Sequence, residues 1–145
     1  MNLLIDVPVE RAALDAILAG GGHVADCLVP PAEKAREVEP ARLAVAEVLF
    51  GTFPPQNFGD LKARRWVQIA SAGYAQLGGL DLPGRGIRAT NALGCFDVPI
   101  AEWTVAMMVN LARDVRQLIR NQEAAVWDRA AVFQREIRGL TIGLW

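Results

Sequence analysis

The chain has 145 residues, of which 52% are hydrophobic and 21% are charged, and its formal net charge at pH 7 is −1. This length and composition suffice for a packed core and argue against long disordered segments. The absence of a basic block argues against binding to nucleic acid or to an acidic membrane surface.

Short apolar runs alternate with helical patterns over the first hundred residues. Residues 9–18 have apolar side chains at helical spacing, and three glycines follow them as a helix C-cap would. Residues 58–65 form a second expected helix. Strands alternating with helices predict an α/β fold, with a flavodoxin-like, five-stranded parallel sheet flanked by helices. The five expected strands are residues 2–6, 23–29, 46–50, 66–70 and 87–91.

The pattern changes near Asp97. This residue, Pro99 and Glu102 place a capping acid, a first-turn proline and a second acid where a helix begins. Apolar residues then recur at every third or fourth position, which predicts one helix of about 24 residues. A helix with apolar residues on more than one face needs neighbours on two sides. The second apolar stripe consists of Trp103, Met107 and Leu111.

The chain ends in a short apolar run, RGLTIGLW, although termini are usually polar. Residues 140–145 are therefore expected to form a strand that begins a new layer. Five short strands can cover only one side of the long helix, so we place a domain boundary at its start. The expected domains are residues 1–96, with the flavodoxin-like sheet, and residues 97–145, a linking helix with the start of a second domain.

No basic-then-apolar leader opens the sequence, and the longest apolar stretch, 98–112, is interrupted by Glu102 and Asn110. This stretch is too short to span a bilayer, so we expect a soluble, cytoplasmic protein without a membrane partner. Cys27 and Cys95 lie far apart without CxxC spacing. We expect both to be buried, reduced thiols.

Residues 84–89 (GRGIRA) formally satisfy G-x-G-x-x-A, a dinucleotide-binding fingerprint. That mechanism requires the glycines to follow a strand and to open a helix, so that the pyrophosphate meets the helix N-terminus. Here Pro83 precedes the glycines and a strand-like run follows them, which favours an ordinary loop. The sequence contains no metal-ligand spacing, serine-centred elbow or Walker loop.

His23 is the one histidine, and a histidine can act as a general base. Its nearest carboxylate, Asp26, is three positions away and would lie on the opposite face of the same strand. We therefore interpret His23 as a surface or strand-edge residue. The acids Asp6 and Glu10, like Glu37 and Glu39, are interpreted as solvated charge.

Residues 71–74 (SAGY) follow an expected strand at its C-terminal end, which is where open α/β sheets bind ligands. A turn of small residues and glycine there allows backbone N–H groups to point at an anion such as a carboxylate. The sequence leaves two interpretations open, a binding loop and an ordinary turn.

Several blocks of the sequence occur in the order found in one enzyme family. Residues 66–73 (WVQIASAG) are similar to its strand and substrate loop, and 80–87 (LDLPGRGI) to a segment in which an acid precedes a Gly-Ile strand start. The most specific blocks are 89–94 (ATNALG) and 99–102 (PIAE), followed by a long helix that ends in LAR. Together with Trp127 and the final RGLTIG, these blocks cover nearly the whole chain. The chain resembles the D-isomer-specific 2-hydroxyacid dehydrogenases.

The resemblance implies that residues 140–145 are the first strand of an NAD-binding Rossmann domain. In that family a Gly-rich phosphate loop follows this strand, and the catalytic arginine, glutamate and histidine lie further along. None of these positions is present here, so the resemblance assigns no catalytic residue to this chain. We therefore expect the 145 residues to be a truncated, N-terminal part of such an enzyme.

The resemblance also implies a small set of binding residues. The backbone amides of Ala72 and Gly73 match the loop that holds the substrate carboxylate in the family. Ile100 and Thr104, at the start of the long helix, match positions near the nicotinamide. An acid that is common shortly after the substrate loop is absent, since residues 75–76 are Ala-Gln.

The complete enzyme implied by the resemblance is an NAD- or NADP-dependent oxidoreductase, commonly a homodimer, acting on a small 2-oxo or 2-hydroxy acid. This chain alone lacks the cofactor loop and the acid–base pair, so we expect no tight cofactor binding and no activity. One alternative is a stand-alone flavodoxin-like binding or regulatory module without catalysis. Another is a subunit whose missing half is supplied by a second chain.

Overall fold

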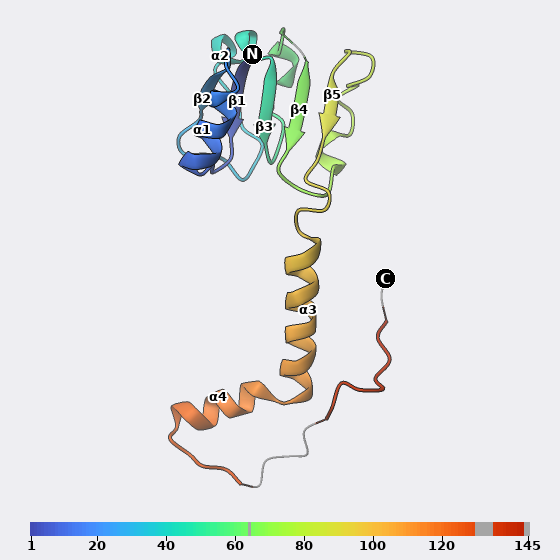
Figure 1. Cartoon of the computed structure of the whole chain (residues 1–145). Helices are drawn as coiled ribbons and strands as arrows, with labels where there is room; N and C mark the ends of the chain where they lie inside the picture. Colours follow the sequence, from blue (N-terminus) through green and yellow to red (C-terminus); the bar gives the residue numbers. More distant parts are fainter. Residues whose placement is uncertain (64, 130–134, 144–145) are drawn as a thin grey trace. The chain divides into compact units, whose positions relative to one another are not determined.

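The structure is a computed structural model that describes residues 1–63, 65–129 and 135–143. The chain divides into two compact units, Met1–Cys95 and Phe96–Trp145, which are described separately. The first unit holds the sheet and the second holds two helices (Figure 1).

The first unit is built on a sheet of five parallel strands in the order β2-β1-β3-β4-β5. This is the flavodoxin-like strand order, so the expected α/β fold is confirmed. All five strands expected in this unit are present, with ends shifted by no more than two residues. Their bounds are β1 (Asn2–Asp6), β2 (Val24–Cys27), β3 (Val48–Gly51), β4 (Trp66–Ile69) and β5 (Arg88–Thr90).

Short helical segments connect the strands. The helix expected at 9–18 is confirmed as α1, and Gly21 and Gly22, just beyond its end, have the positive φ angles of a glycine stop. The sequence does not predict α2, because six residues are too few to show apolar periodicity. The segments are α1 (Arg11–Ala19), α2 (Pro40–Val45) and the 3₁₀ turns η1 (Phe58–Asp60) and η2 (Ala75–Leu77).

The prediction of a helix at residues 58–65 is wrong beyond the first turn. Only η1 is helical, and Leu61 after it is extended and buried in the core. Asn57, directly before η1, accepts a side-chain hydrogen bond from the Val38 amide (3.0 Å) and donates one to the Val38 carbonyl (2.8 Å). This segment is therefore tied to a distant loop. Residue 64 lies outside the described residues.

The main core lies on one face of the sheet. Leu4, Leu49 and Val67 stand in register across β1, β3 and β4 and point to this face. Side chains of α2, η1 and the intervening loops close over them. The core residues are Leu4, Leu28, Val38, Leu43, Ala46, Leu49, Phe58, Leu61, Val67, Ile69, Leu82 and Ile87.

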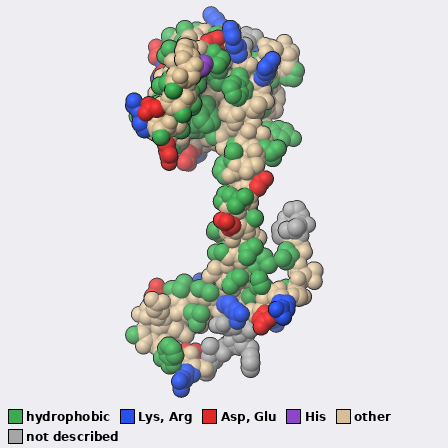
Figure 2. Space-filling model, viewed as in Figure 1, with side chains coloured by type: hydrophobic (Ala, Val, Ile, Leu, Met, Phe, Trp, Pro, Cys, Tyr) green, Lys and Arg blue, Asp and Glu red, His purple; other side chains and the backbone are tan. Residues whose placement is uncertain are grey.

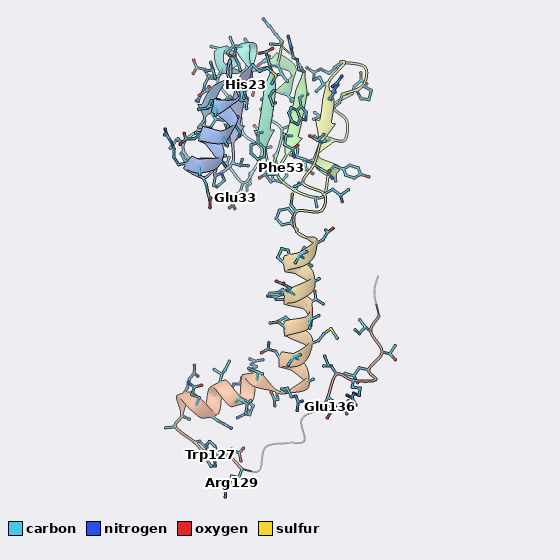
Figure 3. All side chains as sticks on the ribbon, viewed as in Figure 1. His23, Glu33, Phe53, Trp127, Arg129 and Glu136 are labelled. Atoms are coloured by element: carbon cyan, nitrogen blue, oxygen red, sulfur yellow. The ribbon has the colours of Figure 1, made fainter. Side chains whose placement is uncertain are left out.

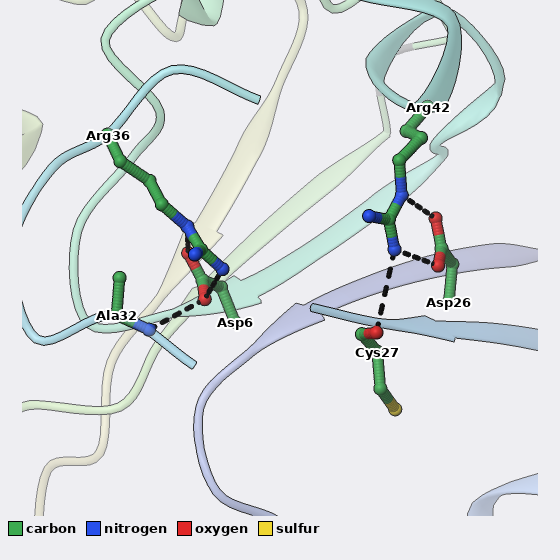
Figure 4. Close-up of polar contacts among 6 residues, drawn as sticks. All are labelled: Asp6, Asp26, Cys27, Ala32, Arg36 and Arg42. Atoms are coloured by element: carbon green, nitrogen blue, oxygen red, sulfur yellow. Dashed lines mark hydrogen bonds and ion pairs between the residues drawn. The ribbon is translucent and has the colours of Figure 1, made fainter. Parts of the chain in front are cut away.

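The expectation that Asp6, at the end of β1, is solvated charge is wrong. Its carboxylate is only 17% exposed and pairs with Arg36. Arg36 donates to it through Nε (3.1 Å) and Nη2 (2.6 Å), and the amide of Ala32 donates a third hydrogen bond at 2.8 Å (Figure 4). The segment that follows β2 is thus held to the C-terminal end of β1.

A second ion pair joins β2 to α2. Arg42 donates to both carboxylate oxygens of Asp26, with an Nε–Oδ2 distance of 2.7 Å (Figure 4). This hydrogen bonding lowers the pKa of Asp26; burial opposes the effect, and the charge of Arg42 adds to it. The same interaction raises the pKa of Arg42. The pair is more solvated than that of Asp6, because the Asp26 side chain is 44% exposed.

Both cysteines are exposed, so the expectation that they are buried is wrong. Cys27 is the last residue of β2, which is an edge strand of the sheet. Cys95 lies between β5 and the first helix of the second unit, outside any regular element. Neither position is enclosed by packed elements of its unit.

The second unit contains α3 (Asp97–Ala112) and α4 (Val115–Glu123) in place of the single helix of about 24 residues. The break falls at Asp114, whose φ of 47° is left-handed and cannot continue a right-handed helix. Its carboxylate instead caps α4 by accepting from the Gln117 amide. Asp97 is the first helical residue and not the cap, because Phe96 occupies the cap position.

The strand expected at 140–145 is not formed in its described part. Residues 140–143 have no regular secondary structure, and 144–145 lie outside the described residues. A strand requires a paired neighbour to satisfy its backbone, and these described residues pair with none. In the described parts of the chain, no helix has the length and apolar character needed to cross a membrane.

Candidate functional site

The candidate site lies where β3, β4 and β5 end. Parallel strands bring their C-terminal ends to the same edge of the sheet, and here side chains link the loops that follow them. Gln76 donates from one side-chain nitrogen to the Thr52 carbonyl after β3 (3.0 Å) and to the Ser71 hydroxyl after β4 (2.8 Å). Asn91, after β5, donates to the Ala72 carbonyl at 2.7 Å.

The carbonyl groups of Ser71, Ala72 and Gly73, in the loop after β4, all accept hydrogen bonds. The Ser71 carbonyl accepts from the Ala92 amide at 3.0 Å, and the Gly73 carbonyl accepts from the Ser71 hydroxyl at 2.8 Å. The amides of Ala72 and Gly73, in contrast, donate no hydrogen bond to any described residue. The loop therefore presents two adjacent unused donors with its acceptors already satisfied.

The space above this loop is open. A Cβ atom built at Gly73 would meet no other atom within 4 Å, and Tyr74 beside it is exposed. Phe53 stands at the same edge of the sheet, on the loop after β3 (Figure 3). Adjacent amides without a partner form an arrangement that can bind anions such as carboxylates.

The other residues considered from the sequence lie elsewhere. His23 stands at the opposite edge, where β2 begins, with its Nδ1 atom 3.5 Å from the N-terminal amine (Figure 3). It is a half-buried strand-edge histidine, as the sequence indicates. The glycines of 84–89 form a turn that leads into β5, so the ordinary-loop interpretation of this motif is confirmed.

Ile100 and Thr104 lie one turn apart near the start of α3, in the second unit. Ile100 is exposed. The Thr104 hydroxyl donates to the Ile100 carbonyl at 2.7 Å, which is the usual back-bonding of threonine within a helix. The side chain of Ile100 thus offers an apolar contact, and the hydroxyl of Thr104 is already bonded to its own helix.

The bracing role of Gln76 and Asn91 is not apparent from the sequence. Gln76 lies in the 3₁₀ turn η2 and Asn91 in a loop, and their partners lie 5 to 24 positions away. Only their place after neighbouring parallel strands could have suggested that they meet. Among the described residues, no three His, Cys, Asp or Glu side chains gather in a way that could hold a metal ion.

No protein-family model matches the chain, and no curated protein matches it. Several solved structures share its fold. The D-lactate dehydrogenase of Aquifex aeolicus, in complex with NAD and lactic acid, superimposes with a TM-score of 0.68 at 15% identity over 91% of this chain and 40% of that one.

Two further structures show the same likeness. The TT0316 protein of Thermus thermophilus gives a TM-score of 0.72 at 20% identity, covering 97% of this chain and 47% of that one. The NAD-dependent formate dehydrogenase of Staphylococcus aureus, in complex with NAD, gives 0.65 at 15% identity, covering 90% and 44%. At such low identity the likeness establishes the fold, and this chain spans less than half the length of each structure.

Proposed function

We propose that this chain is the substrate-side part of a D-isomer-specific 2-hydroxyacid dehydrogenase, and that the amides of Ala72 and Gly73 bind the carboxylate of a small 2-oxo or 2-hydroxy acid. The order of the sequence blocks supports the family. The shared fold with a D-lactate dehydrogenase supports it independently of those blocks.

The observation that carries the proposal is the orientation of the loop after β4. Gln76 ties the Ser71 hydroxyl to the loop after β3, and Asn91 binds the Ala72 carbonyl, while the amides of Ala72 and Gly73 stay unpaired among the described residues. An ordinary turn has no need of bracing from both neighbouring loops. Preorganised amides bind a charged group without further ordering of the loop, so less free energy is lost on binding.

The dinucleotide-binding motif found in the sequence lacks the geometry of a phosphate site for NAD or NADP. The G-x-G-x-x-A motif at 84–89 leads into a strand and not into a helix, so no helix N-terminus meets it. Thr104 has already used its hydroxyl proton within α3. We therefore assign only the apolar contact of Ile100, with Thr104 beside it, to the nicotinamide side, and we expect this chain alone to show no turnover.

The binding proposal is tested by titrating the isotope-labelled 145-residue chain with pyruvate and recording amide NMR signals. A hydrogen bond to a charged group contributes about 1.5–3 kcal/mol, and two of them, reduced by the loss of ligand entropy, correspond to a Kd in the millimolar range. We expect the largest shifts at Ala72 and Gly73. Pyruvamide, which is uncharged, is the matched ligand control and should produce much smaller shifts.

Gly73→Ala separates a ligand contact from a backbone requirement. The φ angle of Gly73 is not in the left-handed region and a Cβ meets no neighbour, so we expect its folding stability to stay within about 0.5 kcal/mol. The added methyl group would occupy space next to the amides, so pyruvate should bind several-fold more weakly. Gly59→Ala, at a glycine equally free of contacts in η1, is the control.

Two kinds of result would contradict the proposal. Steady NADH-dependent reduction of glyoxylate by the purified chain would contradict the expected lack of turnover. Shifts confined to residues outside the loop, or equal shifts with pyruvate and pyruvamide, would contradict carboxylate binding and favour a flavodoxin-like module without this substrate.

A further inference from the structure

Three adjacent strands, β2, β1 and β3, begin beside one another at the edge of the sheet opposite the candidate functional site. The Val24 amide donates to the Met1 carbonyl at 3.0 Å, which places Met1 beside His23. The Glu47 amide donates to the Asn2 carbonyl at 2.9 Å. Figure 1 shows the N-terminus at this edge. Backbone hydrogen bonds of the sheet therefore hold the start of the chain between His23 and Glu47.

The amine of Met1 lies close to two other atoms that can bind a metal ion. Its nitrogen is 3.5 Å from Nδ1 of His23 and 3.8 Å from Oε2 of Glu47. Two ligand atoms that each lie about 2.0–2.2 Å from one tetrahedral metal ion are about 3.3–3.6 Å apart. The distance between the amine and the imidazole matches this spacing, and the carboxylate oxygen has to move by only a few tenths of an ångström.

The other hydrogen bonds at this edge leave lone pairs for a metal ion. A neutral amine that binds a metal through its lone pair keeps two N–H groups, so its hydrogen bond to the Gly22 carbonyl (2.7 Å) is retained. Oε2 of Glu47 accepts from the Asn2 amide at 3.0 Å, and Oε1 pairs with Arg65 at 3.0 Å. A carboxylate has about four lone-pair sites, so these two contacts do not exhaust it.

The charges at this edge allow a cation to bind. The carboxylate of Glu47 is 21% exposed and attracts positive charge. Arg65 opposes a cation, but its side chain is 68% exposed, so water and salt screen its charge. Metal ligands bind in their deprotonated forms, so a metal ion replaces the proton of the amine as the positive charge beside Glu47.

The kind of donor atom selects the class of metal ion. Two nitrogen atoms and one carboxylate oxygen suit Zn²⁺, whereas Mg²⁺ and Ca²⁺ prefer oxygen ligands alone. Three protein ligands leave the fourth position of a tetrahedral ion to water. The histidine side chain, purple in Figure 2, reaches the surface of the first unit, so an ion has access to it from solvent.

We propose that the amine of Met1, the Nδ1 atom of His23 and the carboxylate of Glu47 form a binding site for Zn²⁺ or a similar divalent transition-metal ion. The site exists where the Met1 amine is free. It lies at the opposite edge of the sheet from the loop at 71–74, so it goes beyond the proposed carboxylate binding and does not depend on it.

The proposal is tested by titrating the untagged 145-residue chain with Zn²⁺, using isothermal titration calorimetry and amide NMR. Three ligands at a solvent-exposed edge bind more weakly than the four of a structural zinc site, and we expect a Kd of about 1–100 µM. The largest amide shifts should occur at Asn2, His23, Val24 and Glu47. Mg²⁺ at the same concentrations is the control and should produce no shifts at these residues.

Three changes each remove one donor. His23→Gln and acetylation of the Met1 amine should each raise the Kd for Zn²⁺ at least about tenfold, and Glu47→Gln should raise it several-fold. Acetylation alters no side chain, so it separates the loss of a ligand from a change in folding. Glu33→Gln is the matched control, because this exposed carboxylate lies at the other edge of the sheet (Figure 3), and its Kd should stay unchanged.

The exposed thiol of Cys27, at the far end of β2, is the competing zinc ligand in this unit. Cys27→Ser should therefore leave the Kd for Zn²⁺ unchanged. Binding that survives acetylation, shifts centred on Cys27, equal shifts with Mg²⁺, or no binding at millimolar Zn²⁺ would each overturn the proposal.

Discussion

The ion pair of Asp6 with Arg36 gives the sharpest test of the packing described above. Asp6→Asn keeps the shape of the side chain but removes the charge and turns an amide group toward Arg36. The carboxylate accepts three hydrogen bonds and is 17% exposed. Hydrogen bonds to charged groups contribute about 1.5–3 kcal/mol, so the loss of the charge should lower the free energy of unfolding by about 2 kcal/mol.

Asp26→Asn is the matched control, because Asp26 also accepts a forked pair of bonds from an arginine but is 44% exposed. Exposed ion pairs contribute about 0.2–1 kcal/mol, so this variant should lose less than 1 kcal/mol. The measurement is urea unfolding followed through the NMR signals of β1, β3 and β4, which report on the first unit. A thermodynamic cycle with Arg36→Met shows whether the effect belongs to the pair.

The test compares how much each of the two variants lowers the free energy of unfolding. Burial strengthens a charged hydrogen bond, because water competes less for the groups that form it. If Asp26→Asn destabilises the unit as much as Asp6→Asn, or if Asp6 and Arg36 show no coupling, then the reasoning from burial is wrong. A loss above 5 kcal/mol for Asp6→Asn would also contradict it, since that loss would require a fully buried pair.

Three further results are expected. Arg42 lowers the pKa of Asp26 in the folded chain. The contribution of Asp26 to stability is therefore full above the unfolded pKa of 3.8 and is lost as the pH falls through the folded pKa. In an acid titration, the stability difference between wild type and Asp26→Asn should vanish. Leu43→Ala, at a fully buried position, should lower the free energy of unfolding in urea by about 2–5 kcal/mol. Asp114→Ala should remove the cap of α4 and lower its helicity by circular dichroism, with a cap contribution of about 1 kcal/mol; unchanged helicity would contradict the capping role.

The five strands of the first unit could be predicted because their signal is local. Apart from β5, which is Arg-Ala-Thr, each is a short, mainly apolar run bounded by turn residues. Alternation with helical segments restricts the sheet to parallel strands. The same local logic correctly rejected the G-x-G-x-x-A motif at 84–89, since a strand follows it. It also located the loop at 71–74 beside the C-terminal edge of the sheet.

Two of the errors, both in helix prediction, share a physical cause. Helix periodicity continues through residue 114, but Asp114 adopts a left-handed conformation and caps the next helix, which divides the pattern into α3 and α4. Residues 58–65 have a helical pattern too, but only Phe58–Asp60 is helical, and Leu61 after it is extended and buried in the core. In both places a specific local interaction overrides an average preference of a few tenths of a kcal/mol per residue.

By itself the sequence determined the five strands of the first unit, their parallel arrangement and the edge at which a ligand loop would lie, because these follow from the order of apolar and turn residues along the chain. Only the tertiary structure decided that Asp6 is paired and that the amides of Ala72 and Gly73 have no partner among the described residues. Each of these depends on residues far apart in the chain, such as Asp6 with Arg36 or Ala72 with Asn91. Such pairs acquire their geometry only when the folded backbone brings them together.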